Sequence, residues 1–475
     1  MQKFFTTGLA ILFISTLGLL AVQIFGIQSS QVSFSRQQNG TQTGAYVKVL
    51  EAGLGQTEVF NYQRMGFNKG FIRFSPDGRF LAAGSEAGEV LLYDTRGSLI
   101  WRNTVGLGKL SALEFTPDGR AVLVGDTSQQ GCLFSLDVTD GKELWRQASV
   151  NELGVDIREK TFPGMVAIRT DSAGMIYAVA QRYIKHPDGR NQYVGRIYKY
   201  THDGRKAGAF PSDQNLDCWV SWLGVDDDGG RVVFSTANFD MAKYTYDQNV
   251  YCLDGTLQTV LWSRYLDAIQ PYPNVTMRTG LEISGNGGYV AGIASDGRCF
   301  LFDGEQGEEL WRRSITQPQK IAGVYINSTG NFSQIVGEYA IFTTGNTYNR
   351  ANWQLPTPVE NPNSNSLFVF DLQGNLVNNY KIGGMIEQIS TGKHQAALAG
   401  GRNVRSKDPS VHGLYIVAIP EARLVDYAAT TGPCVAAAIS ADGRYAAGIE
   451  APIQLDDGQI IGEYKLILLA KQNRQ

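Results

Sequence analysis

The sequence predicts an all-β protein made of repeated four-stranded units, and three observations support this prediction. Glycine is abundant, with 54 residues in a chain of 475, against an average of roughly 7% in globular proteins. Only 18% of the residues are charged, while 11% are aromatic. A pattern of apolar run, tight turn and second apolar run recurs every ~40 to 65 residues. These features are typical of many short strands joined by tight turns.

Two passages near the N-terminus align almost residue for residue. They are Ile72–Gly84 (IRFSPDGRFLAAG) and Leu113–Gly125 (LEFTPDGRAVLVG), and each is followed by a third and a fourth apolar run. In the turn Ser75–Gly78, proline presets φ and glycine takes the left-handed conformation that closes a hairpin. Each passage therefore reads as four short antiparallel strands.

Weaker copies of this turn follow at residues 171–174, 227–230, 284–287, 327–330, 390–392 and 440–443. Repeats of about 40 residues with four strands each are typical of the blades of a β-propeller. We predict a single propeller over residues 45–475 with about eight blades, or seven because the turn at Ser390 is degenerate. The last repeat supplies three strands, so Tyr46–Leu50 or Thr57–Tyr62 is expected to add the fourth and remove an open sheet edge.

The N-terminal residues carry a different signal. Residues 4–27 form an almost uninterrupted apolar run behind Lys3. As a helix this run would be about 36 Å long, enough to cross a hydrocarbon core of about 30 Å. We expect residues 1–27 to be a retained transmembrane signal anchor, with a cleaved signal peptide as the alternative. The polar residues 28–44 are expected to be a flexible linker, with the N-terminus cytoplasmic and the propeller extracytoplasmic.

Composition excludes several function classes. The formal net charge is −3 without a long run of either sign, so no nucleic-acid partner is predicted. The five cysteines are scattered, which is typical of small buried apolar residues rather than of disulfides or zinc ligands. The four histidines lack metal-ligand spacing and accompany no nucleophile motif. The sequence therefore predicts no catalytic residues, no metal and no cofactor.

The Ser/Thr-Pro-Asp-Gly-Arg turns resemble those of WD-repeat propellers. The segments Leu136–Trp145 and Phe302–Trp311 resemble the tryptophan motif of pyrroloquinoline-quinone-type repeats. The resemblance spans roughly residues 45–470 and is strongest in the first, second and fifth repeats. It implies the propeller fold and blade-to-blade packing by Trp101, Trp145, Trp262 and Trp311.

The resemblance implies the fold but no single function. The group includes quinone-dependent dehydrogenases and non-enzymatic scaffolds such as the assembly propeller of bacterial outer-membrane biogenesis. The dehydrogenases typically carry a vicinal disulfide under the cofactor, and this chain has no Cys-Cys pair. The resemblance therefore favours the non-enzymatic branch.

The segments between second and third strands differ greatly in length. Five are long, namely residues 183–193, 238–249, 347–366, 401–413 and 451–462. Propeller topology would bring all five to one face. Long loops in a compact domain are usually functional or disordered, so this face is the predicted binding surface, with tolerated insertions as the alternative.

Two of these insertions supply the candidate binding residues. The insertion 347–366 contains residue types enriched at binding hot spots, Tyr348, Arg350 and Trp353. The insertion 401–413 adds a cationic cluster made of Arg402, Arg405, Lys407 and His412. Such a cluster suits a sugar, a phosphate or an acidic protein, although charged loops are often simply solvated.

The sequence thus predicts a membrane-anchored scaffold that binds a protein partner, a membrane complex or a glycan. The alternative is an exported propeller enzyme, either quinone-dependent or carbohydrate-active, with a site in the central channel. The innermost strands recognised in the sequence offer only one carboxylate for that purpose, Glu114.

Overall fold

The structure is a computed structural model that describes residues 44–62, 70–106, 108–189, 191–240, 245–269, 275–277, 279–349 and 357–472. The predicted anchor and nearly all of the predicted linker lie outside these residues. Within the described ranges, no helix combines the length and the apolar character that crossing a membrane requires.

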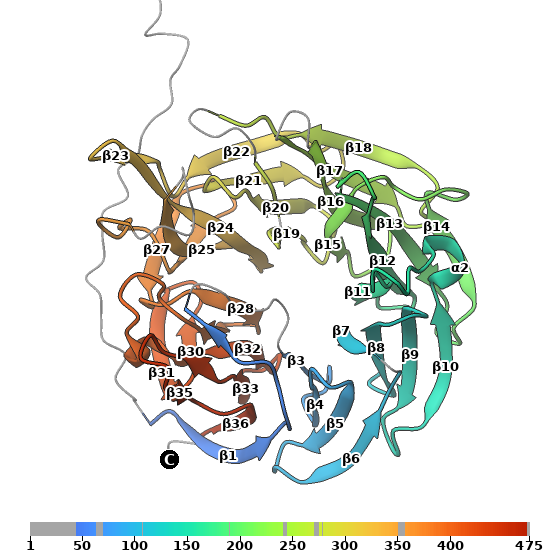
Figure 1. The fold of residues 1–475 in the computed structure, drawn as a ribbon, viewed down its shortest axis with the longest axis horizontal. Coiled ribbons are helices and arrows are strands. Elements are labelled where there is room, and N and C mark those ends of the chain that lie inside the picture. Colours follow the sequence, from blue (N-terminus) through green and yellow to red (C-terminus); the bar gives the residue numbers. More distant parts are fainter. Residues whose placement is uncertain are drawn as a thin grey trace, which may run out of the picture. The chain divides into compact units, whose positions relative to one another are not determined.

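The described strands group into antiparallel units of four, here called blades, which follow one another around a common centre (Figure 1). A pairing of Gly164 with Thr127 joins the second and third blades into one sheet. The first strand of a blade lies toward the centre and the fourth at the rim. The first four blades comprise β3 (Phe71–Phe74), β4 (Phe80–Gly84), β5 (Glu89–Asp94) and β6 (Leu99–Thr104); β7 (Lys109–Phe115), β8 (Ala121–Thr127), β9 (Cys132–Asp137) and β10 (Glu143–Ala148); β11 (Gly164–Thr170), β12 (Ile176–Lys185), β13 (Asn191–Tyr200) and β14 (Lys206–Phe210); and β15 (Trp219–Val225), β16 (Arg231–Asp240), β17 (Thr245–Asp254) and β18 (Val260–Tyr265).

Further blades continue the same order. They comprise β19 (Leu281–Ile283), β20 (Tyr289–Ile293), β21 (Arg298–Asp303) and β22 (Glu309–Ser314); β24 (Val324–Val336), β25 (Tyr339–Asn349), β26 (Ser366–Asp371) and β27 (Leu376–Lys381), with β23 (Gln319–Ile321) added beside β24; and β28 (Ile386–Thr391), β29 (Gln395–Gly400), β30 (Gly413–Ala418) and β31 (Arg423–Ala429). Within the described residues, two short helices lie in connections, α2 (Val150–Leu153) and the 3₁₀ helix η1 (Pro409–Val411).

The last blade is assembled from both ends of the described chain. Its order is β1-β36-β33-β32, with β32 (Cys434–Ile439), β33 (Tyr445–Glu450), β36 (Lys465–Lys471) and the N-terminal β1 (Tyr46–Gly53). Tyr46 pairs with Lys471 and Gly53 with Lys465. The prediction that Tyr46–Leu50 supplies the missing strand is confirmed. The other candidate, Thr57–Tyr62, contributes β2 (Phe60–Asn61), which forms a small sheet with β34 (Ile453–Gln454) and β35 (Ile460–Ile461).

Most of the predicted turns close as their residue types predict. The turn predicted at residues 327–330 is wrong, because these residues lie within β24 and the β24–β25 hairpin turns at Gly337. The Ser75 hydroxyl accepts a hydrogen bond from the Phe80 amide at 3.0 Å and donates to Asp77 at 2.7 Å. Gly78 has φ of 69°, a left-handed conformation that disfavours other residues. The same geometry recurs at Thr116–Gly119 and at Ser440–Gly443. The sequence repeat is therefore a repeat of first-to-second strand hairpins.

The four predicted packing tryptophans join neighbouring blades. The Trp262 indole Nε1 donates to the Gly304 carbonyl of the next blade at 3.0 Å, and Gly307, with φ of 67°, lies beneath the ring. A Cβ at Gly307 would stand 2.4 Å from the indole. Trp101, Trp145 and Trp311 donate in the same way to Val138, His202 and Leu372. The predicted blade-to-blade role of these tryptophans is confirmed.

Apolar side chains fill the space between blades. Val90 and Leu92 of β5 pack with Val122, Val124 and Phe134 of the next blade. The cysteines are free thiols, four of them buried and Cys218 partly buried. Their buried positions agree with the prediction of small apolar residues in the core.

Candidate functional site

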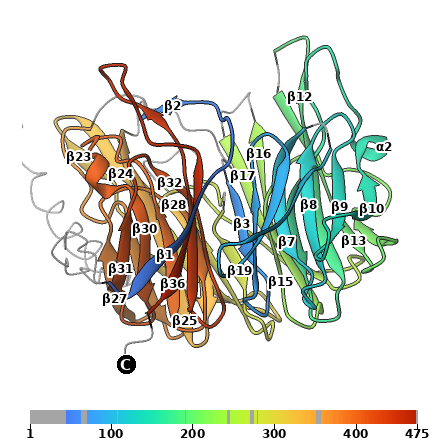
Figure 2. The same ribbon diagram turned by 90° about the horizontal axis from the view of Figure 1, so that it is seen from below.

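Two of the five long insertions are continuations of strands. The hairpin of β12 and β13 remains paired to Lys185 and Asn191, and that of β16 and β17 to Asp240 and Thr245. Figure 2 shows β12 reaching beyond neighbouring strands at the edge where β2 also lies. Residues 183–193 and 238–249 were expected to be loops, and this expectation was wrong because the ladders run nearly to the hairpin tips.

The other three insertions contact one another and the N-terminal segment 54–62, which we call the strap. We define the insertion platform as residues 357–366, 401–413 and 451–462 together with the strap. Arg405 Nη2 donates to the Pro358 carbonyl at 3.1 Å, joining the first two insertions. An ion pair between Lys407 and Asp456 joins the second to the third. Segments far apart in sequence thus form one connected surface.

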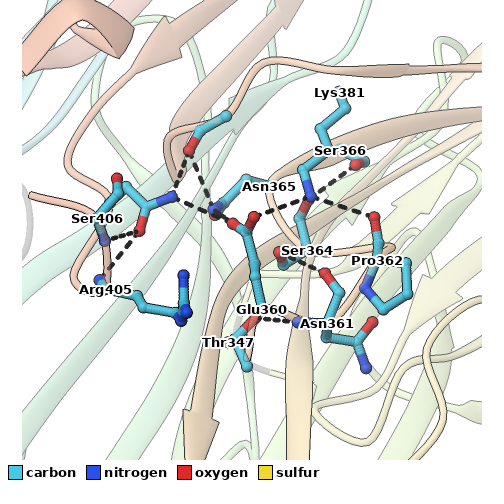
Figure 3. A network of polar contacts seen from close by, with 12 residues as sticks. Thr347, Glu360, Asn361, Pro362, Ser364, Asn365, Ser366, Lys381, Arg405 and Ser406 are labelled. Atoms are coloured by element: carbon cyan, nitrogen blue, oxygen red, sulfur yellow. Dashed lines mark hydrogen bonds and ion pairs between the residues drawn. The ribbon is translucent and has the colours of Figure 1, made fainter. Parts of the chain in front are cut away.

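Glu360 is the centre of a polar network within the platform (Figure 3). Its Oε1 accepts from the amide nitrogens of Asn403 at 3.1 Å and Asn365 at 3.3 Å, and its Oε2 lies 3.2 Å from Lys381 Nζ. Asn403 also donates to the Gly383 carbonyl at 2.7 Å. Buried hydrogen-bond networks hold their members in fixed positions. The platform is therefore fastened to the blade of β24–β27 through Glu360 and Lys381.

Arg402 connects the platform to an innermost strand. Its Nη1 lies 2.9 Å from Oε1 of Glu387 on β28, and its Nε donates to the Tyr62 carbonyl of the strap at 2.8 Å. Both charged side chains are largely buried, and burial raises the pKa of Glu387 while Arg402 opposes that rise. Arg402 is thus engaged in holding the strap and the insertion together.

The remaining predicted site residues differ in their surroundings. Arg405 donates to the Thr357 and Pro358 carbonyls, and His412 is buried with Nδ1 at 3.1 Å from the Thr431 carbonyl oxygen. Lys407 stays partly exposed beside Asp456. Tyr348 lies half-buried in β25. Arg350 and Trp353 lie outside the described residues.

The exposed apolar side chains of the platform are residues that the sequence analysis missed. Val59 of the strap and Val359 are each 39% exposed, and Ile460 of β35 is 54% exposed. They come from three different platform segments. Protein-binding surfaces typically combine an apolar centre with a polar rim. In the sequence, Val359 stands alone among polar residues and prolines, whereas Val59 and Ile460 have the apolar neighbours Phe60 and Ile461.

A cavity of about 800 Å³ lies beside the platform, where the strap leaves β1 and the third insertion returns to β36. Its lining includes Glu51, Thr57, Glu463, Tyr464 and Lys465. Lys465 Nζ lies 2.7 Å from Glu51 and 3.4 Å from Glu463. The hydrogen bond from Lys465 lowers the pKa of Glu51 to about 2. The wall of the cavity is therefore a set of carboxylates paired to one ammonium group.

Carboxylates on innermost strands are more numerous than the sequence revealed. Besides Glu114, Glu282 of β19 and Glu387 of β28 occupy such strands. Glu114 lies 3.3 Å from Arg73 Nε, and Glu282 accepts from Gln334 at 3.2 Å. Burial raises the pKa of Glu282, and the charge of Arg169 opposes the rise. Each carboxylate has a polar partner on another segment.

Four-stranded blades joined by tryptophan-over-glycine contacts define the described part of this chain as a β-propeller. The family model described as outer membrane protein assembly factor BamB matches residues 37–182. The three platform insertions lie outside that match.

Solved propellers similar to this chain include BamB from Moraxella catarrhalis, at 13% identity and TM-score 0.44, covering 75% of this chain and 94% of that one. The Myceliophteria thermophila Cps50 (Swd1) propeller is 12% identical with a TM-score of 0.44, and the match covers 89% of this chain and 100% of that one. The Dos1 propeller is 13% identical with a TM-score of 0.45, and the match covers 85% of this chain and 78% of that one. Abnormal embryogenesis protein 30 of Caenorhabditis elegans is 28% identical over 117 residues, which are 22% of this chain and 11% of that protein.

Proposed function

We propose that this chain is an eight-bladed propeller that binds a protein partner, or a membrane complex, through the insertion platform. One observation carries the proposal: three insertions and the strap fasten to one another and display exposed apolar side chains at Val59, Val359 and Ile460. A surface ordered before binding loses less conformational entropy when a partner docks. Exposed apolar residues within a polar surround supply the contact area.

The proposal includes a membrane tether. The apolar residues 4–27 and the polar residues 28–44 support a single-pass anchor with an extracytoplasmic propeller. The chain enters the described structure at β1, the rim strand that closes the last blade. The proposed tether would therefore reach the propeller through a rim strand.

Affinity purification from native membranes in mild detergent tests the proposal. The platform variant is Val359→Asp combined with Ile460→Asp. The matched control is Leu144→Asp combined with Leu310→Asp, which changes apolar residues of similar exposure, 54% and 47%, on rim strands β10 and β22. We expect a stoichiometric partner with the wild type and the control, and at least tenfold less with the platform variant. Equal recovery with both variants would contradict the proposal.

A glycan is the second candidate partner, and one cluster favours it. Tyr183 and Tyr193 of the β12–β13 hairpin have ring centroids 5.0 Å apart, and Tyr193 and Trp219 are 5.9 Å apart. Aromatic rings offer broad apolar faces with polar edges, a surface against which sugar rings stack. A glycan array with wild type and Tyr193→Ala distinguishes the two candidates, because a glycan site here predicts binding that the variant loses.

A further inference from the structure

Two buried rings hold the strap against the 401–413 insertion. Tyr62, the last described residue of the strap, stacks on His412 with ring centroids 6.2 Å apart and ring planes 27° apart. Tyr62 is 1% exposed and His412 is fully buried. Each ring carries one buried polar atom with no hydrogen-bond partner among the described residues, the Tyr62 hydroxyl and His412 Nε2. Buried polar atoms are rarely left without a partner, so this pair is unusual.

The surroundings of His412 define where its proton lies. Nδ1 is 3.1 Å from the Thr431 carbonyl oxygen, which can only accept, so Nδ1 carries the hydrogen. The backbone is fixed as well, because the His412 amide donates to Pro409 and its carbonyl accepts from the Tyr427 hydroxyl at 2.6 Å. Nε2 therefore bears a lone pair in a buried place, and a second proton there would create a buried cation.

The charged groups around the rings are already engaged. Asp408, whose negative charge favours protonation of His412, accepts a hydrogen bond from the Ser410 amide at 2.8 Å. Asp456 of the third insertion, whose negative charge helps to raise the pKa of Tyr62, forms an ion pair with Lys407. Arg402 is bound to Glu387 and to the Tyr62 carbonyl. From the adjoining strands β30 and β31, the neutral tyrosines Tyr415 and Tyr427 face the same region.

We propose that Tyr62 and His412 form a pH-sensitive latch that keeps the strap on the other platform segments at neutral pH and releases it on acidification. A protonated imidazole in this position would be an unpaired buried cation, which is strongly unfavourable. Release would separate Val59 and β2 from β34, and so remove one of the segments that make up the platform surface. The latch is a property of the chain alone and does not depend on the proposed partner.

The sign of the pH effect follows from burial. Burial lowers the pKa of His412 in the latched form, and the hydrogen bond to the Thr431 carbonyl and the charge of Asp408 oppose this only in part. The released form has the ordinary pKa of about 6.5. The latch is therefore fully stable above about pH 6.5 and loses stability as the pH falls below that value. The latching equilibrium can shift by up to about tenfold at pH 5.5, because each pH unit below 6.5 favours the protonated, released form tenfold.

Hydrogen–deuterium exchange of the full-length protein in detergent, without any partner, tests the latch. We expect protection of residues 54–62, corrected for the intrinsic exchange rate, to fall three- to tenfold between pH 7.5 and pH 5.5. His412→Phe keeps the ring and removes the titration, so its strap protection should not change with pH beyond the change in β33. His202→Asn, an exposed histidine in a turn of the β11–β14 blade, should behave as the wild type.

The proposal is overturned if the strap of the wild type shows no selective loss of protection at pH 5.5. It is equally overturned if His412→Phe loses protection as the wild type does. Should His412→Phe fail to fold, the imidazole resonances decide, because the chain has only four histidines. A latch predicts that one of them titrates below pH 6.5 together with the loss of strap protection, and a normal titration of all four would contradict it. The exchange experiment uses the protein without a partner, so its result stands even if the affinity purification recovers no partner.

Discussion

The contact between Trp262 and Gly307 makes a sharp prediction about stability. Replacing Gly307 by alanine would place a Cβ 2.4 Å from the indole ring, too close for any side-chain contact, so the ring or the turn must shift. Gly307 also has φ of 67°, a conformation that costs a non-glycine residue about 1–2 kcal/mol. Overpacking of a well-packed site adds about 1–3 kcal/mol. We therefore expect Gly307→Ala to destabilise the propeller by about 2–5 kcal/mol.

A matched variant separates the two contributions. Gly337, in the turn between β24 and β25, has φ of 59° and no atom within 4 Å of an added Cβ. Gly337→Ala should therefore cost only the backbone contribution, about 1–2 kcal/mol. Urea unfolding of full-length protein in detergent, followed by intrinsic fluorescence, measures both variants. Equal destabilisation by the two variants would refute the claim that the indole docks on this turn.

Two further perturbations test other parts of the account. Glu387→Gln leaves the Arg402 guanidinium largely buried without a counter-charge and should destabilise the protein by about 3–5 kcal/mol. The control Glu309→Gln breaks an exposed ion pair and should cost about 0–1 kcal/mol. Urea unfolding measures the free energy of unfolding of both variants. Deletion of residues 44–53 removes β1 and exposes the edge of β36, so size-exclusion chromatography with light scattering should show dimers or larger species. A deletion variant that stays monomeric and as stable as the wild type would contradict the proposed ring closure.

Local chemistry made the blades predictable from sequence. Turns such as Ser75–Gly78 specify their own geometry through proline, aspartate and glycine, and the tryptophans mark the fourth strands. The need to cover the edge of β36 identified Tyr46–Leu50 as the closing strand, because an unpaired edge is unfavourable. These features depend on neighbours in sequence or on a single missing strand.

The candidate site could not be predicted in full from the sequence, because its contacts join residues that are far apart in the chain. Arg402, Arg405 and His412 read as a cationic cluster, yet their partners Glu387, the 357–358 carbonyls and Thr431 come from other parts of the chain. Conversely, Val359 is an isolated apolar residue in a polar segment and Ile460 belongs to an apolar pair with Ile461, and only the packing of the insertions places both on the platform.

Photo-crosslinking in native membranes tests the central claim most directly. A photoreactive amino acid replaces Ile460 on the platform in one sample and Leu144 on the rim strand β10 in another, and crosslinked proteins are identified by mass spectrometry. The account predicts one abundant partner crosslinked from position 460 and not from position 144. The same products from both positions, or no product from position 460, would contradict the claim that the insertion platform binds a protein partner.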